Sequence, residues 1–94
     1  MSSLPRKAFR ELERKSIAVL KAAGYSCDTL SSKNLFNVMG TSPSEFVLIQ
    51  IVTEDWPDND GLKAIKSYPA PRNARKLIHL WRTYARTPDV REVK

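Results

Sequence analysis

The chain contains few of the residues on which disulfide-stapled or zinc-binding domains depend. It has one cysteine, Cys27, one histidine and three glycines among 94 residues. A lone cysteine cannot form an internal disulfide, which excludes a disulfide-stapled scaffold and favours a reducing, cytoplasmic setting. No apolar run approaches the roughly 20 residues of a membrane span, and the first residues lack the apolar stretch of a signal peptide. We therefore expect a cytoplasmic protein without a membrane partner.

Basic residues outnumber acidic ones in this sequence. Sixteen Lys and Arg against ten Asp and Glu give a net charge of +6 and a pI near 9.8. This excess favours an anionic partner such as nucleic acid, although a solvated basic surface on a small domain is the alternative explanation. The chain is 41% hydrophobic and 28% charged, which is ordinary for a folded protein, and its length suits one core. We expect a single domain over residues 1–94, with a core over about 5–93.

The first half of the sequence predicts one amphipathic helix followed by three strands. Ser2 or Ser3 suits the N-cap of the helix, and Gly24 suits its C-terminal cap. Glu13 lies at the seam between an apolar side of the helix and a basic stripe. The stripe consists of Arg6, Arg10, Arg14 and Lys21. The helix is predicted over about residues 5–23, and the strands over 25–30, 35–39 and 45–53.

The second half predicts a polar loop, a helix and a last strand. Turn-forming residues recur through 54–71, which indicates a mobile loop. Apolar residues at steps of three and four predict a helix over 72–86, with Trp81 on its core face. The strand at 89–93 would lie parallel to an earlier strand after this helical crossover. The polar face of the predicted helix consists of Arg72, Arg75, His79, Arg82 and Arg86.

Two short segments hold the most specific pattern in the chain. Asn37 lies in the second predicted strand, and Gln50 and Val52 lie in the third, 13 and 15 residues further on. With the order helix, strand, strand, strand, helix, strand, this pattern resembles the PD-(D/E)XK nuclease superfamily, nearest to archaeal-type Holliday junction resolvases. The resemblance implies a single α/β domain with a mixed central sheet flanked by helices, the restriction endonuclease-like fold. It also implies a homodimer.

The resemblance implies a site from which the charges have been lost. In such enzymes a Glu on the first helix, an Asp on the second strand and a Glu-x-Lys on the third strand converge at one end of the sheet. The corresponding residues here are Glu13, Asn37, Gln50 and Val52. Carboxylates hold the cation that activates water and neutralises phosphate charge, and neutral amides do this poorly. We therefore expect a vestigial, catalytically inactive site without a metal or other cofactor.

Two alternatives remain open at the level of sequence. An active nuclease would use Mg²⁺ together with Glu13 and relocated groups from Asp28, Glu54 or Asp55. The acidic run at the start of the polar loop is more typical of a solvated turn than of a metal site. It consists of Glu54, Asp55, Asp58 and Asp60. The other alternative is a protein-interaction subunit on a nuclease scaffold, whose basic rows would bind an acidic protein.

The arginine rows favour binding of nucleic acid, and of DNA in particular, through the phosphate backbone with little base specificity. Trp56, in the polar loop, would either stack on an unpaired base or pack under its own loop. His79 is expected to be an exposed histidine in the second basic row. The predicted contacts with nucleic acid are Arg6, Arg10, Arg14, Arg72, Arg75, His79, Arg82 and Arg86.

Overall fold

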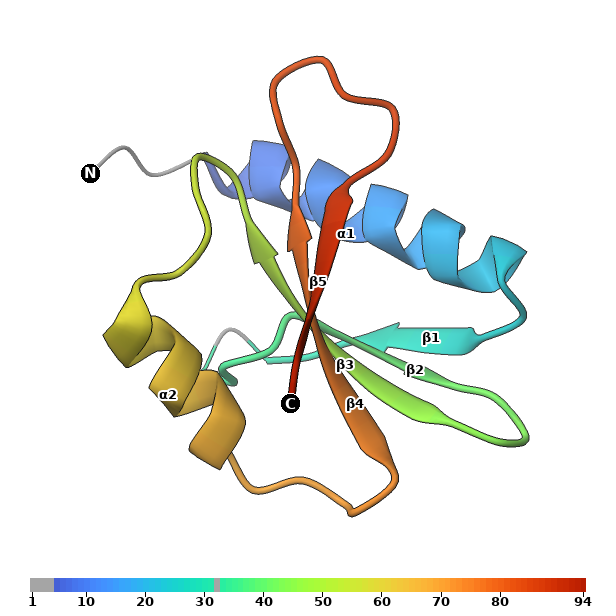
Figure 1. The fold of residues 1–94 in the computed structure, drawn as a ribbon. Coiled ribbons are helices and arrows are strands. Elements are labelled where there is room, and N and C mark those ends of the chain that lie inside the picture. The colour runs from blue at the N-terminus through green and yellow to red at the C-terminus, as the bar shows by residue number, and fades with distance from the viewer. Residues whose placement is uncertain (1–4, 32) are drawn as a thin grey trace.

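The computed structural model describes residues 5–31 and 33–94. The predicted cap at Ser2 or Ser3 lies outside these residues. Figure 1 shows two helices and five strands in the described chain. In chain order they are α1 (Arg6–Ala22), β1 (Ser26–Thr29), β2 (Val38–Thr41), β3 (Phe46–Val52), α2 (Asn59–Ser67), β4 (Ala74–Leu80) and β5 (Asp89–Val93).

The strands form one mixed sheet whose spatial order is the same as their chain order. The neighbouring pairs β1–β2, β2–β3 and β4–β5 are antiparallel, and β3–β4 is parallel, with Ile49 opposite Leu77. A parallel pair needs a crossover connection, and α2 supplies it. The two edges of the sheet are therefore β1 and β5.

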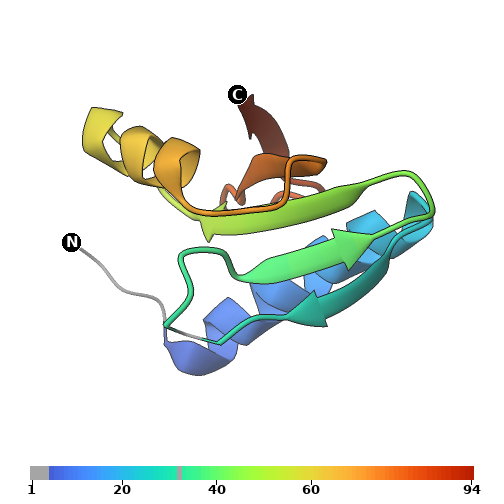
Figure 2. The same ribbon diagram turned by 90° about the horizontal axis from the view of Figure 1, so that it is seen from below.

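The two helices cover opposite faces of the sheet, as Figure 2 shows. On one face, α1 packs through Leu20 and its neighbours against Ile49, Ile51 and Leu77. On the other face, Ile65 of α2 packs against Leu48 and Ile78, together with Phe36 from the loop before β2. Side chains of a strand alternate between its faces, so β3 and β4 contribute to both cores. The predicted α/β fold with a mixed sheet flanked by helices is confirmed.

Residues 72–86 do not form the predicted helix, because β4 occupies their centre. The run from Leu77 to Trp81 is buried throughout, as expected of a central strand covered on both faces. Its apolar residues also recur at steps of three and four, so periodicity alone favoured the wrong element. The predicted core position of Trp81 is confirmed, since the side chain is 3% exposed.

Residues 54–71 are not one long loop, because they contain α2. Asp58 is the N-cap of this helix and accepts a hydrogen bond from the Gly61 amide at 2.8 Å. At the other end, Lys76 Nζ donates to the carbonyl oxygens of Ile65, Lys66 and Tyr68 at 2.6–2.9 Å. A cap at each end stabilises a helix of only nine residues.

The remaining boundaries differ less from prediction. Gly24 ends α1 with a φ of 97°, the left-handed geometry expected after a helix. The second strand begins at Val38 and not at residue 35, because the side chain of Phe36 is buried in the core between the sheet and α2. We call this cluster, with Leu48, Ile65 and Ile78, the α2-side core. β5 is antiparallel to β4, since a hairpin without a helix joins the two strands. Neither described helix has the length and hydropathy that a membrane crossing requires.

Candidate functional site

Asn37 lies just before β2 and is tied to β3 through both its backbone and its side chain. Its amide N–H donates to the Ile49 carbonyl at 2.8 Å, and its Oδ1 accepts from the Ile51 N–H at 2.7 Å. The two bonds fall on either side of Gln50, so Asn37 lies opposite that residue. Here the side-chain oxygen takes the place of a backbone carbonyl in the sheet. The side-chain oxygen of Asn37 therefore already accepts a hydrogen bond that belongs to the sheet.

Gln50 and Val52 lie on the opposite face of the sheet from α1. Strand alternation places them with Leu48 on the side covered by α2. Gln50 Nε2 donates to the Leu35 carbonyl at 3.3 Å, a bond that an ionised Glu could not make. Val52 is partly buried in the α2-side core. Its apolar side chain therefore suits this position.

Glu13 and Asn37 line the same groove, which has a volume of about 980 Å³ and lies between α1 and the end of β1. Partial burial raises the pKa of Glu13, and the charge of Arg10 acts in the opposite direction. The structure thus places Glu13 and Asn37 on one groove, and Asn37 opposite Gln50. It does not place Gln50 or Val52 in that groove with Glu13. The interpretation of these four residues as a former metal site stays a prediction.

The side chains around Asn37 do not fit a divalent cation. Asn37 Oδ1 is bonded to the backbone, and the amide of Gln50 is neutral and turned toward Leu35. Glu13 is the only carboxylate among the residues that line the groove. Within residues 5–31 and 33–94, no three His, Cys, Asp or Glu side chains form a cluster that could hold a metal ion. Of the acidic run, Asp58 caps α2, and Asp55 Oδ1 accepts from the Trp56 N–H at 2.8 Å.

The arginines of the basic stripe form one wall of this groove. Arg6, Arg10 and Arg14 all line it, together with the apolar side chains of Phe9 and Ile17. All three arginines are exposed, and Arg14 forms an ion pair with Glu11 one turn away. We call this site the α1 groove. It presents guanidinium groups beside the amide of Asn37.

The second predicted basic row does not exist as a row. Its residues lie on β4 and in the loops around it, not on a helix. His79 is 2% exposed, so its prediction as an exposed phosphate contact is wrong. Arg82 is exposed but forms an ion pair with Asp89 at 2.7 Å. Arg72 and Arg86 are exposed in loops on either side of β4.

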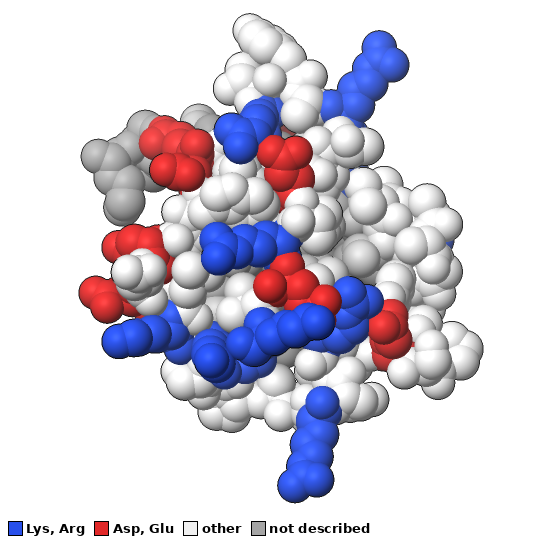
Figure 3. Space-filling view, in the orientation of Figure 1, with Lys and Arg blue, Asp and Glu red and all other residues white. Residues whose placement is uncertain are grey.

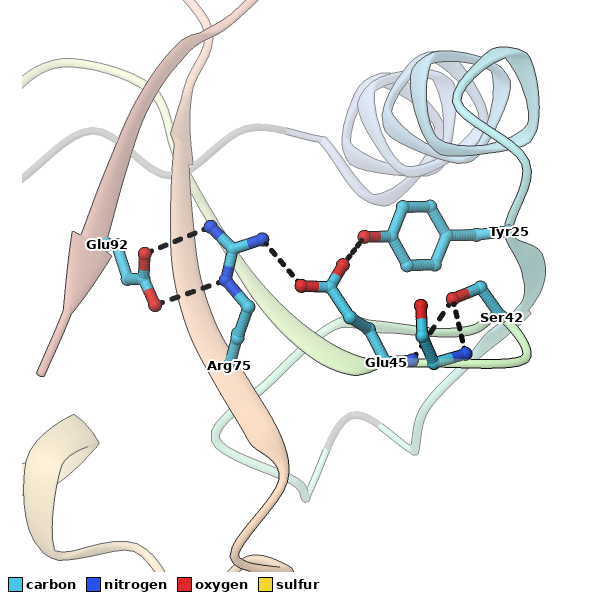
Figure 4. Close-up of polar contacts among 6 residues, drawn as sticks. Tyr25, Ser42, Glu45, Arg75 and Glu92 are labelled. Atoms are coloured by element: carbon cyan, nitrogen blue, oxygen red, sulfur yellow. Dashed lines mark hydrogen bonds and ion pairs between the residues drawn. The ribbon is translucent and has the colours of Figure 1, made fainter.

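Arg75 belongs to a polar network that crosses the sheet (Figure 4). Its guanidinium contacts Glu92 Oε1 at 2.9 Å and Glu45 Oε1 at 3.1 Å. Glu45 also accepts a hydrogen bond from the Tyr25 hydroxyl. The bond from Arg75 lowers the pKa of Glu92, and the bond from Tyr25 lowers the pKa of Glu45. With two carboxylates on its guanidinium, Arg75 has little net charge left for a phosphate.

A buried polar cluster was not predicted from the sequence. Ser16 Oγ contacts His79 Nδ1 at 2.9 Å and Trp81 Nε1 at 2.8 Å, and all three side chains lie in the core. The sequence signal was the position of Ser16 on the apolar side of the predicted helix, where a hydroxyl requires a partner. Trp56, by contrast, packs against the α2-side core. It therefore adopts the second of its two predicted positions.

Comparison with known proteins supports the fold. The sequence matches no protein-family model and no curated protein. Among solved structures, the chain is similar to Hjc from Archaeoglobus fulgidus, a Holliday junction resolvase from an archaeal hyperthermophile. The TM-score is 0.73 at 12% sequence identity, covering 89% of this chain and 76% of that chain. The chain therefore has the PD-(D/E)XK nuclease-like fold of an archaeal Holliday junction resolvase.

Proposed function

We propose that this protein binds nucleic acid, with DNA favoured, in the α1 groove and does not cleave it. The supporting observation is the composition of that groove, which has three exposed arginines along one wall and a single carboxylate, Glu13. Guanidinium groups match the geometry of phosphate oxygens and keep their charge at any physiological pH. A groove of this kind binds a phosphate backbone without reading base edges.

The absence of cleavage follows from the chemistry of Glu13, Asn37 and Gln50. Metal-dependent hydrolysis requires carboxylates that bind the cation and lower the pKa of an attacking water. Asn37 and Gln50 are neutral, and each side chain is engaged in a hydrogen bond to the backbone. Glu13 is left as a lone carboxylate in the groove.

Fluorescence titration of duplex and branched DNA across a salt series tests the binding. We expect the logarithm of the binding constant to fall linearly with the logarithm of salt, by about 0.9 per phosphate contacted. Arg6→Gln and Arg10→Gln should each reduce that slope by about one contact. The matched control is Lys7→Gln with Lys21→Gln, because both lysines are exposed on α1 outside the groove. If the lysine control reduced the salt slope as much as the arginine variants do, that result would contradict binding at the α1 groove.

Incubation of the same DNA with Mg²⁺ or Mn²⁺ tests the catalytic part of the proposal. We expect no cleavage of duplex, branched or single-stranded DNA. Metal-dependent cleavage that Glu13→Gln abolishes would establish the active nuclease instead. Negligible binding to every nucleic acid at about 50 mM salt would favour an acidic protein as the partner.

A further inference from the structure

A second group of cations lies between α2 and β5. Lys63 and Lys66 of α2 line a hollow of about 400 Å³ together with Arg91 and Lys94 from β5 and the residue after it. Leu62 and Val93 also line this hollow. We call it the α2–β5 groove. In Figure 3 a row of basic side chains crosses the molecule over α2 and the C-terminal end of β5.

The charge of the α2–β5 groove is not neutralised from within. None of the residues that line it is acidic, and all four cations are exposed. Within the described part of the chain, Lys63, Lys66 and Arg91 take part in none of the salt bridges. Lys94 acts on Glu92, but the carboxylate of Glu92 is already bonded to Arg75. Four like charges around one hollow favour an anionic occupant.

The groove also continues beyond these residues. A neighbouring hollow of about 440 Å³ shares Lys66, Val93 and Lys94 with it and extends toward Pro71 along the loop after α2. Arg75 and Glu92 also line this hollow and form an ion pair with each other. A basic surface drawn out along two elements fits an extended chain of phosphates better than a single phosphate ion. The phosphate backbone of nucleic acid has regularly spaced charges of this kind.

The α2–β5 groove and the α1 groove are placed far apart by the fold. The α1 groove lies at the end of β1 and the other lies on β5, and these strands are the two edges of the sheet. Four inter-strand spacings separate them, or about 19 Å. The helices that line the grooves cover opposite faces of the sheet. The two grooves therefore lie at different edges of the sheet and beside helices on different faces of it.

We propose that the α2–β5 groove is a second binding site for the phosphate backbone of nucleic acid, through which one molecule bridges two nucleic-acid segments. This inference rests on the proposed function of the α1 groove. The bridging requires no catalysis. It needs only two separate basic grooves that face apart on one small domain.

A two-duplex capture assay tests the proposal. One duplex is immobilised, a second is fluorescent, and the protein is added below saturation at about 50 mM salt. We expect the native protein to retain the fluorescent duplex and to bind two duplexes per molecule. The triple variant Lys63→Gln, Lys66→Gln, Lys94→Gln should still bind one duplex. The amount of fluorescent duplex that it retains should fall at least tenfold. The matched control is Lys7→Gln, Lys21→Gln, Lys33→Gln, which removes the same charge from exposed residues outside both grooves and should retain capture.

The outcomes separate this inference from the proposed function. Failure of the native protein to bind any duplex would overturn both. Binding that depends on Arg6 and Arg10, with one duplex per molecule and no capture, would overturn only the second site. Undiminished capture by the triple groove variant would also overturn it, since a homodimer that uses two α1 grooves would then explain bridging. Sedimentation velocity at the assay concentration identifies that dimer, and thermal unfolding verifies that each variant is folded.

Discussion

Ser16 Oγ lies 2.9 Å from His79 Nδ1, a contact that joins α1 to β4 across 63 residues of sequence. Trp81 Nε1 also bonds to this oxygen, and an indole N–H can only donate. The Ser16 oxygen has a second lone pair and one proton, so it can pair with either neutral tautomer of His79. Desolvation favours the neutral imidazole and lowers the pKa of His79 to about 4.

Replacement of Ser16 by Ala should destabilise the fold. Ser16 is fully buried, and its loss leaves the Trp81 N–H and His79 Nδ1 without the hydroxyl. An unsatisfied buried polar group costs about 1–3 kcal/mol, so we expect the free energy of unfolding to fall by about 3 kcal/mol. Urea denaturation measures it. The control is Ser26→Ala on the exposed side of β1, which should change stability by less than about 0.5 kcal/mol.

Protonation of His79 should make the fold weaker in mild acid. The pKa of His79 is about 4 in the folded state, against 6.5 for an unperturbed histidine, so the unfolded chain binds more protons between these values. Stability present above pH 6.5 is therefore lost as the pH falls, by about 2 kcal/mol between pH 7 and pH 5. His79 is the only histidine of the chain. Denaturation curves at several pH values should show this slope, and His79→Asn should remove it.

The fold was predictable where local pattern and final environment agree. The α1 helix has a basic stripe, an apolar side and Gly24 at its end, and all three indicate the same element. The second half of the fold was not predictable, because the spacing of Leu77, Ile78 and Trp81 fits a helix as well as a strand that is buried on both faces. Only tertiary packing on both faces of β4 separates the two. The α2 helix was missed because Asp58, its N-cap, also suits a turn.

Removal of the ammonium group of Lys76 should loosen α2. Its Nζ donates to three carbonyl oxygens at the C-terminal end of this helix, where the helix dipole also favours a cation. Hydrogen bonds to charged groups contribute about 1.5–3 kcal/mol, so Lys76→Met should lower the free energy of unfolding by about 2 kcal/mol. Chemical denaturation measures it. Lys66→Met, an exposed lysine on the same turn, should have little effect, and equal losses would contradict the capping role.

Tyr84 is strained by its backbone and gains nothing from burial. Its φ is 63°, and it is 99% exposed in the loop between β4 and β5. The left-handed conformation costs a residue with a Cβ atom about 1–2 kcal/mol, and glycine avoids this cost. Glycine also raises the conformational entropy of the unfolded chain, which offsets part of the gain in stability. Tyr84→Gly should therefore raise the free energy of unfolding by about 1 kcal/mol. Tyr84→Ala keeps the strain and should leave stability unchanged in the same thermal unfolding measurement.

The candidate site was only partly visible in the sequence. The sequence pattern predicted that Glu13, Asn37, Gln50 and Val52 converge at one end of the sheet. The structure places Asn37 opposite Gln50, but Glu13 lines a groove that contains neither Gln50 nor Val52. Spacing could not show that Asn37 Oδ1 would be bonded to the Ile51 amide, because that depends on where β2 begins. It also could not reveal the α2–β5 groove, whose lysines lay in a predicted loop. Charges that come together from distant elements become visible only in the fold.

Restoring the two missing carboxylates tests whether the site descends from a metal centre. Asn37→Asp keeps an oxygen that can accept from Ile51, so we expect stability within about 1 kcal/mol of the native protein. Gln50→Glu replaces the donor to the Leu35 carbonyl with an anion and should cost about 1–3 kcal/mol. In the double variant, residue 37 lines the groove with Glu13, and residue 50 lies opposite it on β3, outside the groove. If the two positions and Glu13 once held a cation together, Mn²⁺ should raise the melting temperature by mass action. The native protein should not respond to Mn²⁺. An equal response from both proteins, or none from the double variant, would contradict that ancestry.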